Sequence, residues 1–149
     1  MKKTIFTLFS LFLICLGLNA QSGIVTTTPS IIQASTPNII LTYHAELGNK
    51  GLMGQSADAS LYAHIGLITD KSVNSSDWKY APKWGDNSVK YKLTWVDENT
   101  WQLCIRDLRE YFGISATSDE VIKKIALVFR NADCTAEGKD AFGGDIFVD

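Results

Sequence analysis

Three aromatic residues within a stretch of seven, Trp78, Tyr80 and Trp84, are the side chains whose type and spacing best suit a binding function. Flat aromatic rings with a polar rim pack against the C–H faces of sugar rings. The neighbouring side chains that could hydrogen-bond sugar hydroxyls are Asp77, Lys79, Asp86 and Asn87. If exposed, the three rings predict a carbohydrate-binding surface, with His64 as a marginal addition. The competing interpretation, which we favour for one or two of these rings, places them in the core.

Oxygen ligands gather near the end of the chain, where Asp133, Asp140 and Asp145 accompany Glu137 and several glycines. Carboxylates on a glycine-containing segment suit Ca²⁺. Their spacing does not match the EF-hand loop, and we favour a solvated acidic connection between the last two strands. We therefore expect no cofactor, with calcium as the one candidate.

Catalytic groups are few in this chain. The two histidines, His44 and His64, both fall inside strand patterns, and no G-x-S-x-G sequence supplies a nucleophile elbow. The C-x-x-C and H-x-x-x-H spacings of zinc sites are also missing. Acidic residues fall mainly in turns and loops, and a domain this small offers little cleft for the paired carboxylates of a glycosidase. We predict no catalytic residue and no enzyme activity.

The first 20 residues have the layout of a secretory signal, with Lys2 and Lys3, an apolar stretch from Ile5 to Leu18, and Ala20 before the expected cleavage point. That apolar stretch has 14 residues, whereas a membrane-spanning helix needs about 20. We expect export to the periplasm, the cell surface or the medium, without a membrane span. A lipid anchor on Cys15 is the less favoured alternative, because the preceding Ile14 is not a small residue.

Removing residues 1–20 leaves 12 basic and 16 acidic residues, a net charge of −4. No basic field for nucleic acid is present. The remaining cysteines, Cys104 and Cys134, permit one disulfide in an oxidising compartment. Because Cys104 falls within a strand pattern and Cys134 in a loop, we favour two free thiols.

The elements that must position these residues are short strands separated by turns. Period-2 alternation and β-branched residues predict strands over residues 39–44, 61–69, 89–96, 101–106, 121–130 and 145–148, with a short one at 78–80. A first edge strand near Thr26 is interrupted by Pro29. Trp95 and Trp101 fall in phase with leucines and are expected in the core. The pattern predicts an antiparallel immunoglobulin-like β-sandwich of seven or eight strands.

One short helical turn is predicted at 108–112, because Asp107 can cap its start and Gly113 can end it. No repeat divides the chain, and about 24–149 forms one domain of ordinary size. The last expected strand, 145–148, ends one residue before the sequence ends at Asp149, which favours a single module without an attached catalytic domain.

Four strings carry a resemblance to a known family: LYAHIGLIT at 61–69, DWKY at 77–80, LREYFGI at 108–114 and LVFRNADCTAEGKDAFGGDIFVD at 127–149. Together they resemble the early-set immunoglobulin-like module on the N-terminal side of exported α-amylase-family enzymes of Bacteroidetes-type bacteria. The resemblance implies an association with α-glucan utilisation, with starch or glycogen as ligand and an amylase as partner.

Two departures from that family matter. The catalytic barrel has no counterpart here, so the enzyme activity is not implied. Cys134 stands where the family usually has glycine, and if that position needs a positive φ, the cysteine is strained there. We expect a non-catalytic module that binds α-glucan. The alternative is a structural or interaction module that orients a partner amylase without binding sugar.

Overall fold

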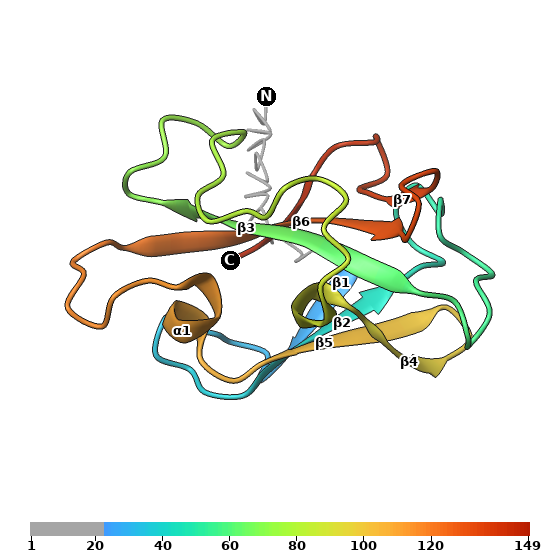
Figure 1. Ribbon diagram of the computed structural model, residues 1–149, viewed down its shortest axis with the longest axis horizontal. Helices are drawn as coiled ribbons and strands as arrows, with labels where there is room; N and C mark the ends of the chain where they lie inside the picture. Colours follow the sequence, from blue (N-terminus) through green and yellow to red (C-terminus); the bar gives the residue numbers. More distant parts are fainter. Residues whose placement is uncertain (1–22) are drawn as a thin grey trace, which may run out of the picture.

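The computed structural model describes residues 23–149, and Figure 1 shows them as two layers of β-strands. The expected signal segment, with its cleavage point after Ala20 and with Cys15, lies outside the described residues. Residues 23–149 form eight strands and one α-helix, and all strand pairs are antiparallel. The predicted all-β antiparallel sandwich is therefore confirmed.

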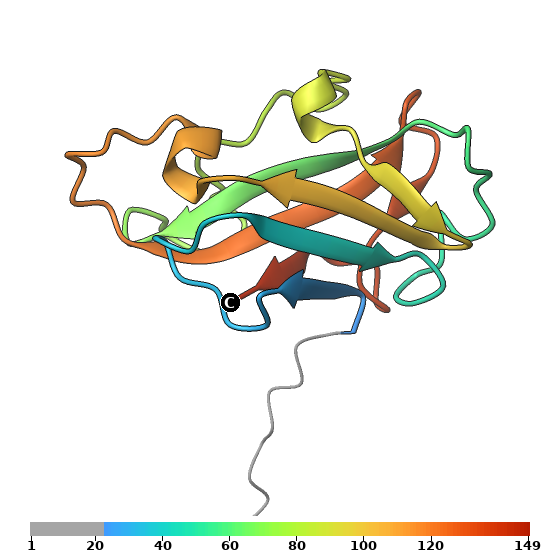
Figure 2. The ribbon, with the colours of Figure 1, turned by 90° about the horizontal axis from the view of Figure 1, so that it is seen from below.

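Each layer has four strands. Sheet A has the order β1 (Val25–Thr28), β2 (Ile39–His44), β5 (Thr100–Ile105) and β4 (Thr94–Asp97). Sheet B is centred on β6 (Ile122–Asn131), with β3 (Leu61–Thr69) on one side and β7 (Glu137–Gly138) and β8 (Ile146–Val148) on the other. Figure 2 shows sheet A in front of sheet B.

The core lies between the two sheets because alternate residues of each strand point inward. On β2, the buried positions Ile39, Leu41 and Tyr43 alternate with partly exposed ones. The ring of Tyr43 stacks on that of Phe129 from β6, with centroids 3.9 Å apart. This contact joins the two sheets across the core.

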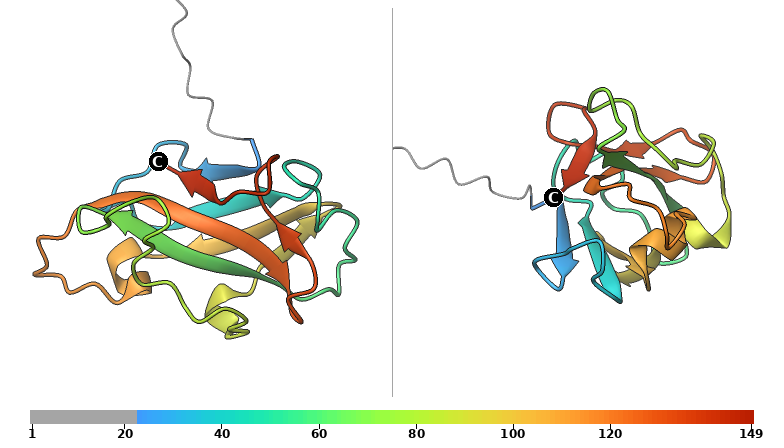
Figure 3. Two further views of the ribbon diagram at one scale, coloured as in Figure 1. Left: turned by 90° about the horizontal axis from the view of Figure 1, so that it is seen from above. Right: turned by 90° about the vertical axis from the view of Figure 1, so that its left-hand side faces the viewer.

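Sheet B is also buried on much of its outer face. Tyr62, Val128 and Arg130 point away from the core and are nevertheless buried. The cover comes from the segment 70–88, called here loop 70–88, whose Lys79 exchanges two backbone hydrogen bonds with Leu67 on the free edge of β3 (2.9 and 2.8 Å). At the opposite edge of sheet B from β3, loop 139–145 joins β7 to β8. Figure 3 shows both loops beside β3 and β6.

The predicted helix is present as α1 (Leu108–Phe112). Asp107 caps it by accepting a hydrogen bond from the backbone N–H of Glu110 (2.8 Å), and Gly113 ends it at φ 71°. It lies on the same side of the sandwich as the 3₁₀ helix η1 (Val89–Tyr91) (Figure 2). The Tyr111 hydroxyl donates to the carbonyl of Lys90 (3.0 Å), which joins the two short helices.

Four local predictions were wrong. The expected strand at 89–96 is η1 followed by β4, and Trp95, expected in the core, is 40% exposed. Trp95 pairs with Trp101, but β4 is the outermost strand of sheet A, and a register shift follows Trp95. The expected strand at 78–80 is reduced to a single bridge at Lys79, and β7 falls where a loop was expected.

Candidate functional site

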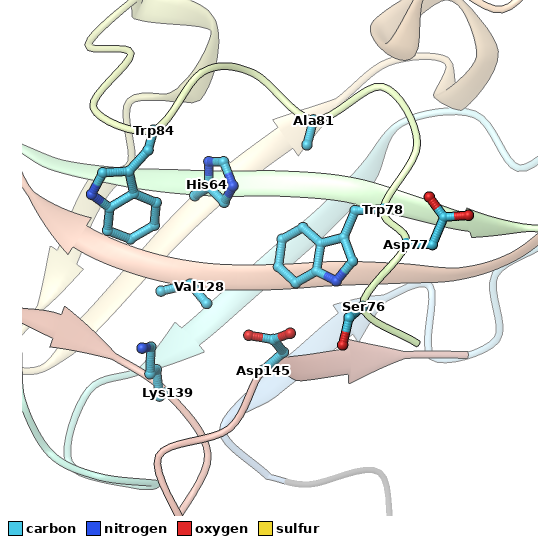
Figure 4. Close-up of a pocket in the computed structure, with 9 residues that line it drawn as sticks. All are labelled: His64, Ser76, Asp77, Trp78, Ala81, Trp84, Val128, Lys139 and Asp145. Atoms are coloured by element: carbon cyan, nitrogen blue, oxygen red, sulfur yellow. The ribbon is translucent and has the colours of Figure 1, made fainter. Parts of the chain in front are cut away.

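An open depression of about 400 Å³ lies on the outer face of sheet B and is called here the aromatic depression (Figure 4). His64 on β3 and Val128 on β6, which are register partners, form its floor. The remaining lining residues are Ser76, Asp77, Trp78, Ala81 and Trp84 from loop 70–88, with Lys139 and Asp145 from loop 139–145. The depression thus lies between two loops that approach from opposite sides of the sheet.

The two indole rings flank His64. The rings of His64 and Trp78 are stacked, with centroids 5.5 Å apart and planes at 27°, and Trp84 meets His64 edge-on at 4.9 Å and 70°. Trp84 is 48% exposed, whereas Trp78 is half-buried and donates its indole N–H to the Ser75 carbonyl (3.1 Å). The structure therefore brings together three of the four residues predicted for sugar binding.

Gly66 lets loop 70–88 lie close to the sheet. A Cβ at this position would come 3.0 Å from the Cβ of Ala81 and 3.3 Å from the Cβ of Trp78. These distances are shorter than ordinary carbon–carbon contacts of about 3.5–4.0 Å. A side chain at this position would push Ala81 and Trp78 outward by a few tenths of an ångström, so Gly66 helps to position Trp78.

The turns of loop 70–88 are held by its own side chains. Asn74 accepts a hydrogen bond from the backbone N–H of Ser76 (2.8 Å), and Asp77 accepts one from Val73 (3.0 Å). Lys79 donates to both carboxylate oxygens of Asp77 at 2.9 Å. The hydrogen bond from Lys79, followed by that from Val73, lowers the pKa of the Asp77 carboxyl. Asp77 is therefore a carboxylate at neutral pH.

Arg130, on β6, fixes the other end of the loop. Its guanidinium donates to the Asp86 carbonyl (2.5 Å) and to the side-chain oxygen of Asn87 (2.8 Å). Its guanidinium carbon lies 5.2 Å from the Tyr62 ring centroid and 5.9 Å from that of Trp84. Arg130 was not among the predicted site residues. The one signal was a charged side chain at the end of a strand whose preceding residues are apolar.

Tyr80 does not join the two tryptophans. Its backbone has φ 60°, which interrupts strand alternation, and its hydroxyl donates instead to the buried carboxylate of Glu120 (2.5 Å). Hydrogen bonds from Tyr80 and then Thr69 lower the pKa of Glu120, and the same contact raises the pKa of Tyr80. Tyr80 therefore anchors the loop and does not line the aromatic depression.

Two lysines around the depression have carboxylate partners, whereas the carboxylate of Asp145 has no hydrogen-bond donor in the part of the chain that the structure describes. Lys139 pairs with Glu137 at 2.5 Å, and Lys79 pairs with Asp77. Among residues 23–149, no side chain or backbone group donates a hydrogen bond to the carboxylate of Asp145. Asp145 thus presents free acceptor oxygens to the depression.

His64 carries no charge at neutral pH. Burial, and then the positive charge of Arg130, lowers its pKa below the ordinary histidine value, while Asp145 acts weakly in the opposite direction. A neutral imidazole keeps one N–H donor and one acceptor nitrogen. The floor of the depression is therefore uncharged, polar and aromatic.

Two of the three acidic residues considered for calcium, Asp133 and Asp140, accept hydrogen bonds within their own turns. Asp133 accepts from the hydroxyl of Thr135 (2.8 Å), and Asp140 accepts from the N–H groups of Phe142 (2.8 Å) and Gly144 (2.7 Å). Within residues 23–149, no group of three or more His, Cys, Asp or Glu side chains is placed to hold a metal ion. Calcium binding by Asp133, Asp140 and Asp145 stays an untested prediction.

The two cysteines are not joined by a disulfide, and both are free thiols. Cys104 is exposed on β5 of sheet A, whereas Cys134 lies in the turn that follows β6 of sheet B. Cys134 has φ 60°. The condition under which a cysteine is strained at this position, a positive φ, is therefore met.

No family model matches this chain, and no curated protein matches it. Within the described part of the chain, no helix has the length and apolar character needed to cross a membrane. The resemblance to the amylase-associated module remains a prediction.

Proposed function

We propose that this protein is an exported, non-catalytic module that binds a neutral α-glucan in the aromatic depression. The observation that carries the proposal is the placement of Trp78 and Trp84 on either side of His64 in an open hollow of about 400 Å³. Both rings belong to a loop held to the sheet at Lys79 and at Arg130. A site held in advance loses little conformational freedom on binding.

The chemistry of the hollow suits a sugar ring. Indole faces pack against C–H groups, and polar groups at the margin hydrogen-bond hydroxyls. The free carboxylate of Asp145 can accept from hydroxyls, and Ser76 and His64 can donate or accept. This combination of aromatic walls and a few polar groups supports a carbohydrate ligand.

The charges favour a neutral glycan over an acidic one. The two lysines at the site, Lys79 and Lys139, already have carboxylate partners, whereas Asp145 has none among the described residues. The buried guanidinium of Arg130 and the carboxylate of Asp145 act with opposite charges on His64, so the site that residues 23–149 form has little net charge and offers a uronate or sulfated sugar no exposed unpaired cation. The resemblance to modules of exported α-amylase-family enzymes points to α-glucan among neutral polymers, and to an amylase as partner.

A second candidate is an interaction module that orients such an amylase without binding sugar. Trp95 and Val96 on the edge strand β4 are 40% and 42% exposed. Exposed apolar side chains at a sheet edge are suited to pairing with another chain. This candidate predicts that the β4 edge, not the aromatic depression, carries the function.

The deciding experiment compares Trp84→Ala with Trp95→Ala in affinity electrophoresis on glycogen and in calorimetry with maltoheptaose. Removing a stacking indole is expected to weaken glucan binding about 5-fold, since an aromatic contact contributes on the order of 1 kcal/mol. Trp95→Ala is the matched control, because Trp95 is similarly exposed and lies on the other sheet. Both variants should keep the thermal midpoint within a few degrees.

If Trp84→Ala binds glycogen as the wild type does, or if the wild type does not bind, sugar binding at the aromatic depression is excluded. Capture of an amylase that is lost in Trp95→Ala alone would then favour the interaction module. We expect the purified wild type to release no glucose from starch, because the proposed role requires binding only.

A further inference from the structure

Phe142 is the most exposed large apolar side chain of the described residues, at 98%. It occupies the tip of loop 139–145, which forms a turn closed by hydrogen bonds. Asp140 accepts hydrogen bonds from the N–H groups of Phe142 and Gly144, and the Asp140 N–H donates to the Gly144 carbonyl (3.0 Å). Gly143 has φ 80°, which an L side chain rarely adopts. The ring is therefore held out from the molecule by an ordered backbone.

The base of this loop forms one wall of the aromatic depression. Lys139 and Asp145 line the depression, and Phe142 is three residues from each of them. Three residues of extended chain span at most about 11 Å. The Phe142 Cα consequently lies within about that distance of two lining residues, on the side opposite Trp78 and Trp84.

We propose that Phe142 is a second aromatic contact for the ligand, so that the site takes a chain of several neutral sugar units and not a single sugar. The inference rests on the proposed function of the aromatic depression. One sugar unit would lie against Trp84 and His64, and a neighbouring unit of the same chain would stack on Phe142 across the wall formed by Asp145.

The neighbours of Phe142 support a sugar as its occupant. Ala141 and Gly143 leave the ring faces free, since neither has a side chain that could cover them. Asp140 and Asp145 lie two and three residues from Phe142 in the same loop, and their negative charges disfavour an anionic lipid surface. A flat, isolated ring near hydrogen-bond acceptors suits a hydroxyl-rich sugar better than it suits an extended apolar partner.

The test measures binding of maltose, maltoheptaose and glycogen by calorimetry and affinity electrophoresis for the wild type, Phe142→Ala, Phe142→Leu and Phe142→Trp. We expect Phe142→Ala and Phe142→Leu to weaken maltoheptaose binding about 2- to 10-fold and to leave maltose binding unchanged. Phe142→Trp should bind maltoheptaose at least as tightly as the wild type. Val89→Ala is the control, because Val89 is also strongly exposed, at 86%, and lies outside both loops.

The outcomes separate this inference from the proposed function. If the wild type binds glucan and Trp84→Ala loses it, but Phe142→Ala keeps full affinity for maltoheptaose, only the role of Phe142 is overturned. Full affinity in Phe142→Leu also overturns it, because an apolar contact would then suffice without a flat ring. A wild type that binds no glucan overturns both.

Discussion

Replacing Gly66 by alanine tests whether close packing of loop 70–88 on β3 builds the aromatic depression. The added Cβ would lie 3.0 Å from the Cβ of Ala81 and 3.2 Å from the carbonyl oxygen of Lys79. Ordinary contacts begin near 3.5 Å, so residues 78–81 have to move outward by roughly 0.5 Å. That movement stretches the two backbone hydrogen bonds between Leu67 and Lys79, now 2.9 and 2.8 Å.

The expected loss of stability combines two opposing effects. Overpacking of a filled site costs about 1–3 kcal/mol. Alanine restricts the unfolded chain more than glycine does, which stabilises the folded protein by about 0.4–1 kcal/mol. The difference between these effects spans about 0–2.6 kcal/mol, and we expect Gly66→Ala to lower the free energy of unfolding by about 1.3 kcal/mol, the middle of that range. For a domain of this size, that corresponds to a thermal midpoint lower by about 2–10 °C.

Urea unfolding followed by circular dichroism measures this change, and glycogen affinity reports on Trp78, whose backbone moves with the loop. Gly23→Ala is the control, because a Cβ there would meet the Leu47 side chain at an ordinary 3.5 Å. A Gly66→Ala protein as stable as the wild type and with unchanged glycogen affinity would refute the role assigned to Gly66.

Two further predictions concern Cys134 and His64. Cys134→Gly should raise the free energy of unfolding by about 0.5–1 kcal/mol. The left-handed backbone of Cys134 costs about 1–2 kcal/mol, which glycine would relieve, and the greater freedom of glycine in the unfolded chain offsets part of this relief. Cys134→Ala, which removes the thiol but keeps the Cβ, should show no such gain in urea unfolding, and an equal gain in both variants would contradict the backbone argument. The pKa of His64 is lowered in the folded protein, so the unfolded chain binds the proton more tightly and stability should fall as the pH drops below about 6.5. Urea midpoints between pH 7.5 and 5 measure this slope, which should flatten in His64→Asn; the same slope in both proteins would show that other groups cause it.

Strands and caps could be predicted where the determinant is local. The run of β-branched and aromatic residues at Leu61–Thr69 is β3 without any change of bounds, and the cap at Asp107 and the stop at Gly113 both hold. These signals depend on backbone preference and on hydrogen bonds to the nearest residues. No distant part of the chain is needed to satisfy them.

The aromatic site could be predicted only in part. Trp78 and Trp84 were identified from their type and spacing, and the structure brings them together around His64. Tyr80 belonged to the same pattern but turns away, because its positive φ and the buried carboxylate of Glu120 direct its ring elsewhere. Neither influence is visible from spacing, since Glu120 is 40 residues further along the chain.

The sequence by itself determined the class of the fold, most strand positions, the short helix and two aromatic side chains of the site. The tertiary structure alone decided which rings face solvent. Trp95 is exposed because β4 is an edge strand. Arg130 is buried and hydrogen-bonds loop 70–88 because this loop lies over the outer face of sheet B. Alternation along a strand is a short-range property, whereas burial depends on what else packs against each face.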